Sequence, residues 1–126
     1  MINKFQWLEK TKKILVDNGG AELYCLLEVM YKEQKMNFLQ FIYDASRGIG
    51  AVISEGVEYI LDQDLDNPEE FDGVTFVFGD CEGFPMPVQK FISMMQIVSD
   101  AYIEAHPKDK DSIEFYMNKL RERYSE

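Results

Sequence analysis

Three aspartates at alternate positions, Asp62, Asp64 and Asp66, resemble the first ligands of a calcium-binding loop. An EF-hand loop also needs glycine at its sixth position and a bidentate glutamate at its twelfth. Counted from Asp62, those positions hold Asn67 and Gly73 instead. Clustered acids of this kind would still bind Ca²⁺ weakly, but the sequence predicts no dedicated metal site and no cofactor.

Nucleophilic catalysis would have to use His106, the only histidine, with Cys25 or Cys81. His106 precedes a proline at an expected helix end, where a histidine commonly caps carbonyl groups or faces water. Cys25 lies in an apolar helical pattern and is expected in the core, whereas Cys81 is expected in an exposed turn. Gly48-Ile49-Gly50 lacks the third glycine of a phosphate-binding loop and predicts a helix-to-strand turn. We therefore expect that the protein is not an enzyme.

The acidic residues are concentrated in the middle of the chain. The sequence has 13 Lys and Arg against 23 Asp and Glu, giving a formal net charge of −10. Residues 48–83 contain ten of these acids and no Lys or Arg, so they account for the whole net charge. This segment is either a solvated loop that aids solubility or a docking surface for a basic partner. The candidate binding residues are its acids from 58 to 82: Glu58, Asp62, Asp64, Asp66, Glu69, Glu70, Asp72, Asp80 and Glu82.

Composition and charge exclude several functional classes. Phosphate contacts require clusters of Lys and Arg, so we expect no direct binding of nucleic acid or of an anionic membrane surface. No apolar run is long enough to span a bilayer, and residues 1–5 lack the apolar stretch of a signal peptide. With 126 residues, 46% of them hydrophobic, the sequence predicts one domain, residues 1–126, with a real core. A cytoplasmic protein with reduced cysteines is expected.

Hydrophobic periodicity predicts helices at both ends of the chain and strands between them. Helical spacing covers residues 3–17 and then 21–45, the latter as one long helix or as two that break near Asn37. Strand patterns cover 57–61 and 73–79, separated by a polar loop at 62–72.

A turn at 80–83 and a short return strand at 84–86 are expected to follow. A helix from 88 then ends at His106-Pro107, and Asp111 to Glu114 resembles a capping box that opens a last helix. The sequence therefore predicts an α+β fold in which a small antiparallel sheet packs with several helices, with helical N- and C-terminal regions.

The second half of the chain resembles a known family in the order and spacing of its motifs. A glycine-rich turn and strand come first, then the acidic stretch, a second strand, a helix with a histidine-proline end and a last helix. In this order, the motifs resemble those of the ribonuclease-toxin immunity proteins of contact-dependent growth inhibition systems. The resemblance covers residues 46–124, and the first 45 residues show none. The residues that carry it are Arg47-Gly48-Ile49-Gly50, Val57-Glu58-Tyr59, Asp72-Gly73-Val74-Thr75-Phe76, Val88-Gln89-Lys90-Phe91 and Ala101-Tyr102-Ile103-Glu104-Ala105-His106-Pro107.

The resemblance implies an inhibitor that binds the nuclease domain of its cognate toxin in the cytoplasm and blocks access to RNA. The charge distribution agrees with this function, because a ribonuclease presents a positive cleft that an acidic surface would occupy in place of phosphates. The alternative is a small structural adaptor or chaperone-like protein that uses the methionines Met86, Met94 and Met95. Exposure of Met94 together with Ile97 would favour this alternative.

Overall fold

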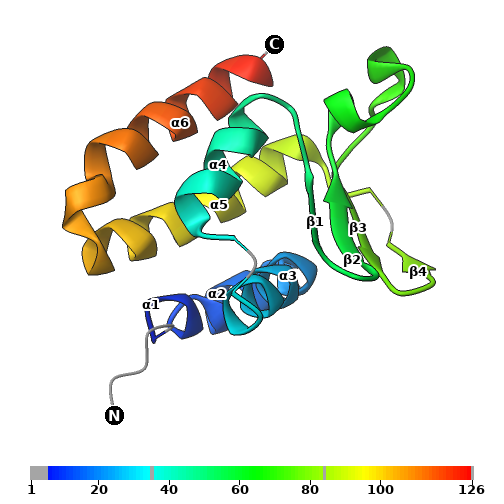
Figure 1. The fold of residues 1–126 in the computed structure, drawn as a ribbon. Coiled ribbons are helices and arrows are strands. Elements are labelled where there is room, and N and C mark those ends of the chain that lie inside the picture. Colours follow the sequence, from blue (N-terminus) through cyan, green and yellow to red (C-terminus); the bar gives the residue numbers. More distant parts are fainter. Residues whose placement is uncertain (1–5, 35, 84, 126) are drawn as a thin grey trace.

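The computed structural model describes residues 6–34, 36–83 and 85–125, with helices gathered on one side of a small sheet (Figure 1). The chain begins with α1 (Gln6–Glu9) and α2 (Lys12–Asp17). The prediction of helix over 3–17 is therefore confirmed at 6–9 and 12–17 and wrong at residues 10 and 11, where the helix breaks. Residues 3–5 lie outside the described residues. The break between the two helices includes Thr11. Its hydroxyl donates a hydrogen bond to the Leu8 carbonyl at 2.6 Å, so this helix-end carbonyl has a side-chain partner.

The next predicted helical stretch forms two helices, α3 (Ala21–Lys32) and α4 (Phe38–Ser46). The break near Asn37 is confirmed, because this residue is the N-cap of α4 and its side chain accepts a hydrogen bond from the Gln40 backbone at 2.8 Å.

Cys25 corrects a prediction, because its side chain is exposed and not part of the core. Helix α3 buries Leu23, Leu26, Leu27 and Met30, which follow a helical spacing of three and four residues. Cys25 falls outside this stripe and faces solvent. Cys81 is also exposed, as expected.

The sheet contains β1 (Ala51–Ser54), β2 (Val57–Ile60), β3 (Thr75–Phe78) and β4 (Cys81–Glu82), which pair antiparallel in chain order. The two predicted strands are confirmed as β2 and β3. Strand β4 occupies residues 81 and 82 of the predicted turn at 80–83, and the tight turn lies at Gly79-Asp80, one residue earlier than predicted. The predicted return strand is reduced to one bridge between Val74 and Met86, and Phe84 lies outside the described residues.

The C-terminal part consists of α5 (Val88–Ala105) and α6 (Lys110–Arg123), and α6 lies against both α4 and α5. The predicted helix end at His106 is confirmed. The capping-box prediction is wrong, because α6 begins at Lys110, before Asp111. Its N-cap Asp109 makes no capping hydrogen bond, since the Asp109 carboxylate accepts one from the Tyr102 hydroxyl at 2.7 Å.

The inner face of the sheet packs on the helices through aromatic rings. Tyr59 of β2 is 2% exposed and stacks on Phe41 of α4, with ring centroids 5.1 Å apart. On the neighbouring strand, Phe76 stacks on Tyr59 at 5.9 Å, and Phe91 of α5 lies at the same distance from Tyr59. This contact fixes the inner face of the sheet to the helices and leaves its other face pointing away from them. The prediction of an α+β fold is confirmed.

Candidate functional site

The register of the sheet distributes the acidic segment over two ends and one face. The two-residue turns Glu55-Gly56 and Gly79-Asp80 lie together at one end, where the Gly79 amide donates to the Gly56 carbonyl. The connection between β2 and β3, which carries the acids from 62 to 72, leaves from the opposite end (Figure 1). Glu58 and Glu82 lie on the strands between these two ends. We call the nine predicted binding residues, from Glu58 to Glu82, the acidic band.

Asp64 has a structural role within this band. One oxygen of its carboxylate accepts hydrogen bonds from the backbone amides of Gly50, at 2.7 Å, and Leu61, at 2.8 Å. A Cβ at position 50 would collide with the Asp64 carboxylate and the Tyr59 carbonyl, so only glycine permits this approach. Asp64 therefore ties the start of the acidic loop to the start of β1.

Asp62 ties the same loop to the end of α6. Its carboxylate accepts hydrogen bonds from the Arg123 guanidinium at 2.7 Å and from the Tyr124 hydroxyl at 2.6 Å. The Asp62 side chain is 13% exposed and that of Arg123 is 29% exposed, so this ion pair is largely shielded. Burial alone would raise the pKa of Asp62, but the hydrogen bonds from Arg123, Tyr124 and Gln63 outweigh burial and lower this pKa.

An open hollow of about 530 Å³ lies beside this ion pair and is lined by Asp62, Pro68, Phe71, Arg123 and Tyr124. The Phe71 ring contacts the Tyr124 ring, with centroids 5.8 Å apart. Burial raises the pKa of the Tyr124 hydroxyl, and its hydrogen bond to Asp62 adds to this effect. The acidic loop is therefore held at both ends, by polar contacts at Asp62 and Asp64 and by an aromatic contact at Phe71.

Sequence reasoning missed Arg123 and Tyr124, because 61 and 62 residues separate them from Asp62. No local pattern signals a contact over this separation.

Besides Asp64, six acids of the band are exposed: Asp66, Glu69, Glu70, Asp72, Asp80 and Glu82. Within the described residues, none of their side chains forms a hydrogen bond or an ion pair. The half-buried Glu58 likewise has no cationic partner there. These carboxylates are free to meet cations of another molecule.

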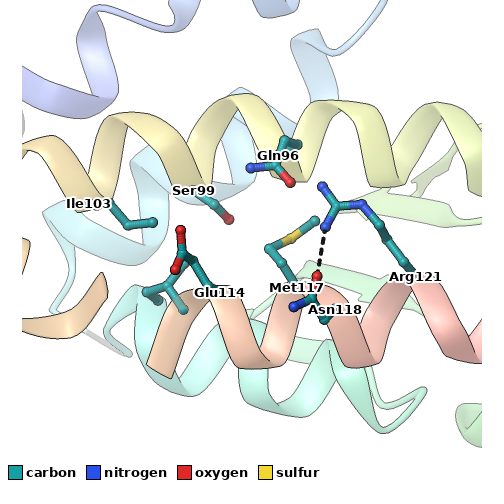
Figure 2. Close-up of a pocket in the computed structure, with 8 residues that line it drawn as sticks. Gln96, Ser99, Ile103, Glu114, Met117, Asn118 and Arg121 are labelled. Carbon is teal, nitrogen blue, oxygen red and sulfur yellow. Dashed lines mark hydrogen bonds between the residues drawn. The ribbon is translucent and has the colours of Figure 1, made fainter. Parts of the chain in front are cut away.

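A pocket of about 310 Å³ between α5 and α6 is separate from the band (Figure 2). Figure 2 shows Ser99 at its centre, with Glu114 toward one end and Arg121 toward the other. The buried Ser99 hydroxyl has no hydrogen-bond partner in the described part of the chain. Ser99 was missed by sequence reasoning, although a polar residue four positions after Met95 on an apolar helical stripe was a usable signal.

His106 lies at the end of α5 and packs against aromatic rings. Its ring stacks on Tyr102, with centroids 4.2 Å apart, and its Nδ1 lies 3.1 Å from the Tyr102 carbonyl oxygen. None of the hydrogen bonds of the described residues joins His106 to a serine or cysteine. The contacts of His106 are thus those of a helix-end residue, as the sequence predicted.

The methionines do not support an exposed adaptor surface. Met86, Met94 and Met95 are 7%, 3% and 0% exposed, and Ile97 is partly buried against the core. The described residues also include no group of three or more His, Cys, Asp or Glu side chains placed to hold a metal ion. In the same residues, no helix is both long enough and apolar enough to cross a membrane.

Comparison with known families gives a match, whereas no curated protein and no solved structure matches the chain. A family model described as CDI immunity protein, where CDI is contact-dependent growth inhibition, matches residues 12–117. The match begins at residue 12, so it includes α2, α3 and α4, where the sequence showed no resemblance, and it leaves out α1. The chain therefore belongs to the CDI immunity protein family, and its partner is a cognate toxin protein.

Proposed function

We propose that this chain neutralises a ribonuclease toxin by placing its acidic band in the toxin's basic RNA-binding cleft, in the cytoplasm of the cell that makes both proteins. The observation that carries the proposal is a set of exposed carboxylates with no cationic partner among the described residues of the chain. Family membership supplies the toxin as partner, and charge complementarity supports a basic surface on it. The chain is proposed to act by binding alone, without catalysis, metal or cofactor.

Within the proposed contact surface, we assign two roles. The residues proposed to face the toxin are Glu58, Asp66, Glu69, Glu70, Asp72, Asp80 and Glu82. Asp62 and Asp64 are proposed to hold the band in place, because their carboxylates are occupied within the chain. A charge-reversal test should therefore leave these two aspartates intact.

The test is the triple variant Asp66→Lys, Glu69→Lys and Glu70→Lys, measured against the nuclease domain of the cognate toxin. Electrostatic steering raises association rates by about 10–10³-fold, so we expect the variant to associate at least about 10-fold more slowly at low salt. Its association rate should also depend less on ionic strength, because fewer favourable charges are left to be screened. Stopped-flow fluorescence measures both quantities.

The matched control is the triple variant Asp17→Lys, Glu104→Lys and Glu114→Lys, which changes the charge equally at exposed positions outside the band. This control should associate much faster than the band variant. Equal rates for the two variants would show that total charge acts and that the band is not the docking surface.

A second measurement tests the toxin's activity. RNA cleavage by the toxin domain should stop at one equivalent of the immunity protein, and added RNA should compete with binding. Complex formation that RNA does not affect would contradict occupation of the RNA cleft.

A further inference from the structure

We propose that Glu58 is the specificity anchor of the toxin interface, and that the loop acids mainly steer the encounter. This inference rests on the proposed function, because it concerns the same partner. In the proposed complex, a single cationic side chain projects from an apolar surface of the toxin and meets the outer face of the sheet. The acids from 66 to 72 would then set the association rate, and Glu58 would set the dissociation rate.

The first observation is the register of the outer face. Val52 of β1 lies opposite Glu58 of β2, Glu58 lies opposite Val77 of β3, and Val77 lies opposite Glu82 of β4. Directly opposed residues in a sheet project from the same face, with Cβ atoms roughly 5 Å apart. The four side chains thus form one row across the sheet, in which Glu58 has a valine on each side.

The second observation is that this row is uncovered while the inner face is filled. Val52 is 71% exposed, the highest value among the exposed large hydrophobic residues of the described part of the chain. Tyr59, adjacent to Glu58 in β2, points to the other face and is 2% exposed. The helices lie on that inner side (Figure 1). A partner can therefore dock on the outer face without displacing any helix.

The third observation is the environment of the Glu58 carboxylate compared with that of the loop acids. Glu58 is already half-buried without a cationic partner in the described residues, and Ile60, two positions along β2, extends its apolar surroundings. Glu69 and Glu70 are exposed in the loop. A docked partner would exclude water around Glu58 with the two valines as walls, whereas ion pairs of the loop acids would stay hydrated at the rim.

The physical consequence is a difference in the strength of equal charges. An ion pair in low dielectric is much stronger than the same pair in water, and removal of one partner from a desolvated pair mainly accelerates dissociation. Exposed pairs contribute little to affinity. A toxin that offers no cation opposite Glu58 gains no affinity from this residue. Glu58 would therefore discriminate among toxins.

The experiment compares two charge-matched variants, Glu58→Gln and Glu69→Gln, for dissociation from the toxin domain by surface plasmon resonance. We expect Glu58→Gln to dissociate at least about 30-fold faster than wild type, and Glu69→Gln less than about 5-fold faster. Circular dichroism and urea unfolding establish that both variants are folded. If both dissociate at the same rate while wild type binds tightly, the anchor is overturned and the proposed function stands.

A second pair of variants tests the valine walls without touching a charge. Val52→Thr keeps the side-chain shape and replaces one methyl group with a hydroxyl that brings water to Glu58, so the dissociation rate of this variant should increase. Val16→Thr is the control, because Val16 is 45% exposed on α2, away from the sheet. Equal effects of the two substitutions would overturn the water-exclusion argument. Absence of any complex with the wild-type chain would overturn both the anchor and the proposed function.

Discussion

At the scale of residues, Asp62 shows how one carboxylate is held ionised inside the acidic band. The hydrogen bonds from Arg123 and Tyr124 favour its charged form more than burial disfavours it, and the pKa of Asp62 is lowered from its ordinary value of 3.8. A group with a lowered folded-state pKa stabilises the protein fully above its ordinary pKa. This stabilisation is lost as the pH falls through the folded-state pKa.

The substitution Asp62→Asn should therefore lower the free energy of unfolding by about 1–2 kcal/mol at pH 7, because a partly shielded charged hydrogen-bond network is lost. At acid pH, below the folded-state pKa of Asp62, the difference from wild type should shrink, since wild-type Asp62 is then protonated too. Urea unfolding at the two pH values measures this difference. Glu69→Gln serves as the control and should change stability little at either pH. A difference that persists undiminished at acid pH would contradict the assigned role.

At the scale of elements, helix α4 ends in a way that only glycine permits. Gly48 has a φ of +77°, its amide donates to the Ala45 carbonyl, and the Ile49 amide donates to the Asp44 carbonyl. These two bonds form a Schellman motif, in which a left-handed residue satisfies the last carbonyls of a helix. The same glycine leaves room for the Arg123 guanidinium, so the end of α4 and the anchoring of the acidic loop depend on one position.

The substitution Gly48→Ala should lower the free energy of unfolding by more than Gly79→Ala does. Both glycines have a positive φ, and a Cβ in this region costs about 1–2 kcal/mol. At position 48 the Cβ would also displace Arg123 from Asp62, whereas at position 79 it would meet no atom within 4 Å. Urea unfolding of the two variants isolates the cost of moving Arg123. Equal losses would show that Arg123 adjusts freely.

At the scale of the whole molecule, the charge of −10 is concentrated around the sheet. Like charges repel one another in the folded state, and salt screens this repulsion over about 10 Å at 0.1 M ionic strength. We therefore expect the urea midpoint of unfolding to rise when NaCl is increased from low to physiological concentration.

This salt effect should be smaller in the triple variant Glu69→Gln, Glu70→Gln and Asp72→Asn, which removes three unpaired charges from the band. The control Asp17→Asn, Glu104→Gln and Glu114→Gln removes as many charges elsewhere and should retain more of the effect. A midpoint that falls with NaCl in the wild-type chain would show that favourable pairs outweigh repulsion in the band.

The sequence alone determined the element types, the α+β class and the segregation of charge. Apolar spacing follows helix and strand geometry directly, so β2, β3 and α5 were predictable from their own residues. The end of α5 followed from His106-Pro107, whereas the break near Asn37 was one of two alternatives that the sequence left open. Family motifs in the second half were also visible without coordinates, although their extent was underestimated.

Tertiary structure alone decided which acids are free and which are occupied. Asp62, Asp64 and Asp66 are equivalent in sequence, yet the first meets Arg123, the second meets the Gly50 amide, and the third has no partner in the described residues. The sequence also did not show that Cys25 faces solvent or that Glu58 lies between two valines in the sheet. Such properties depend on contacts between distant segments, and burial or pairing of a charge is set by what the fold brings next to it, not by its neighbours along the chain.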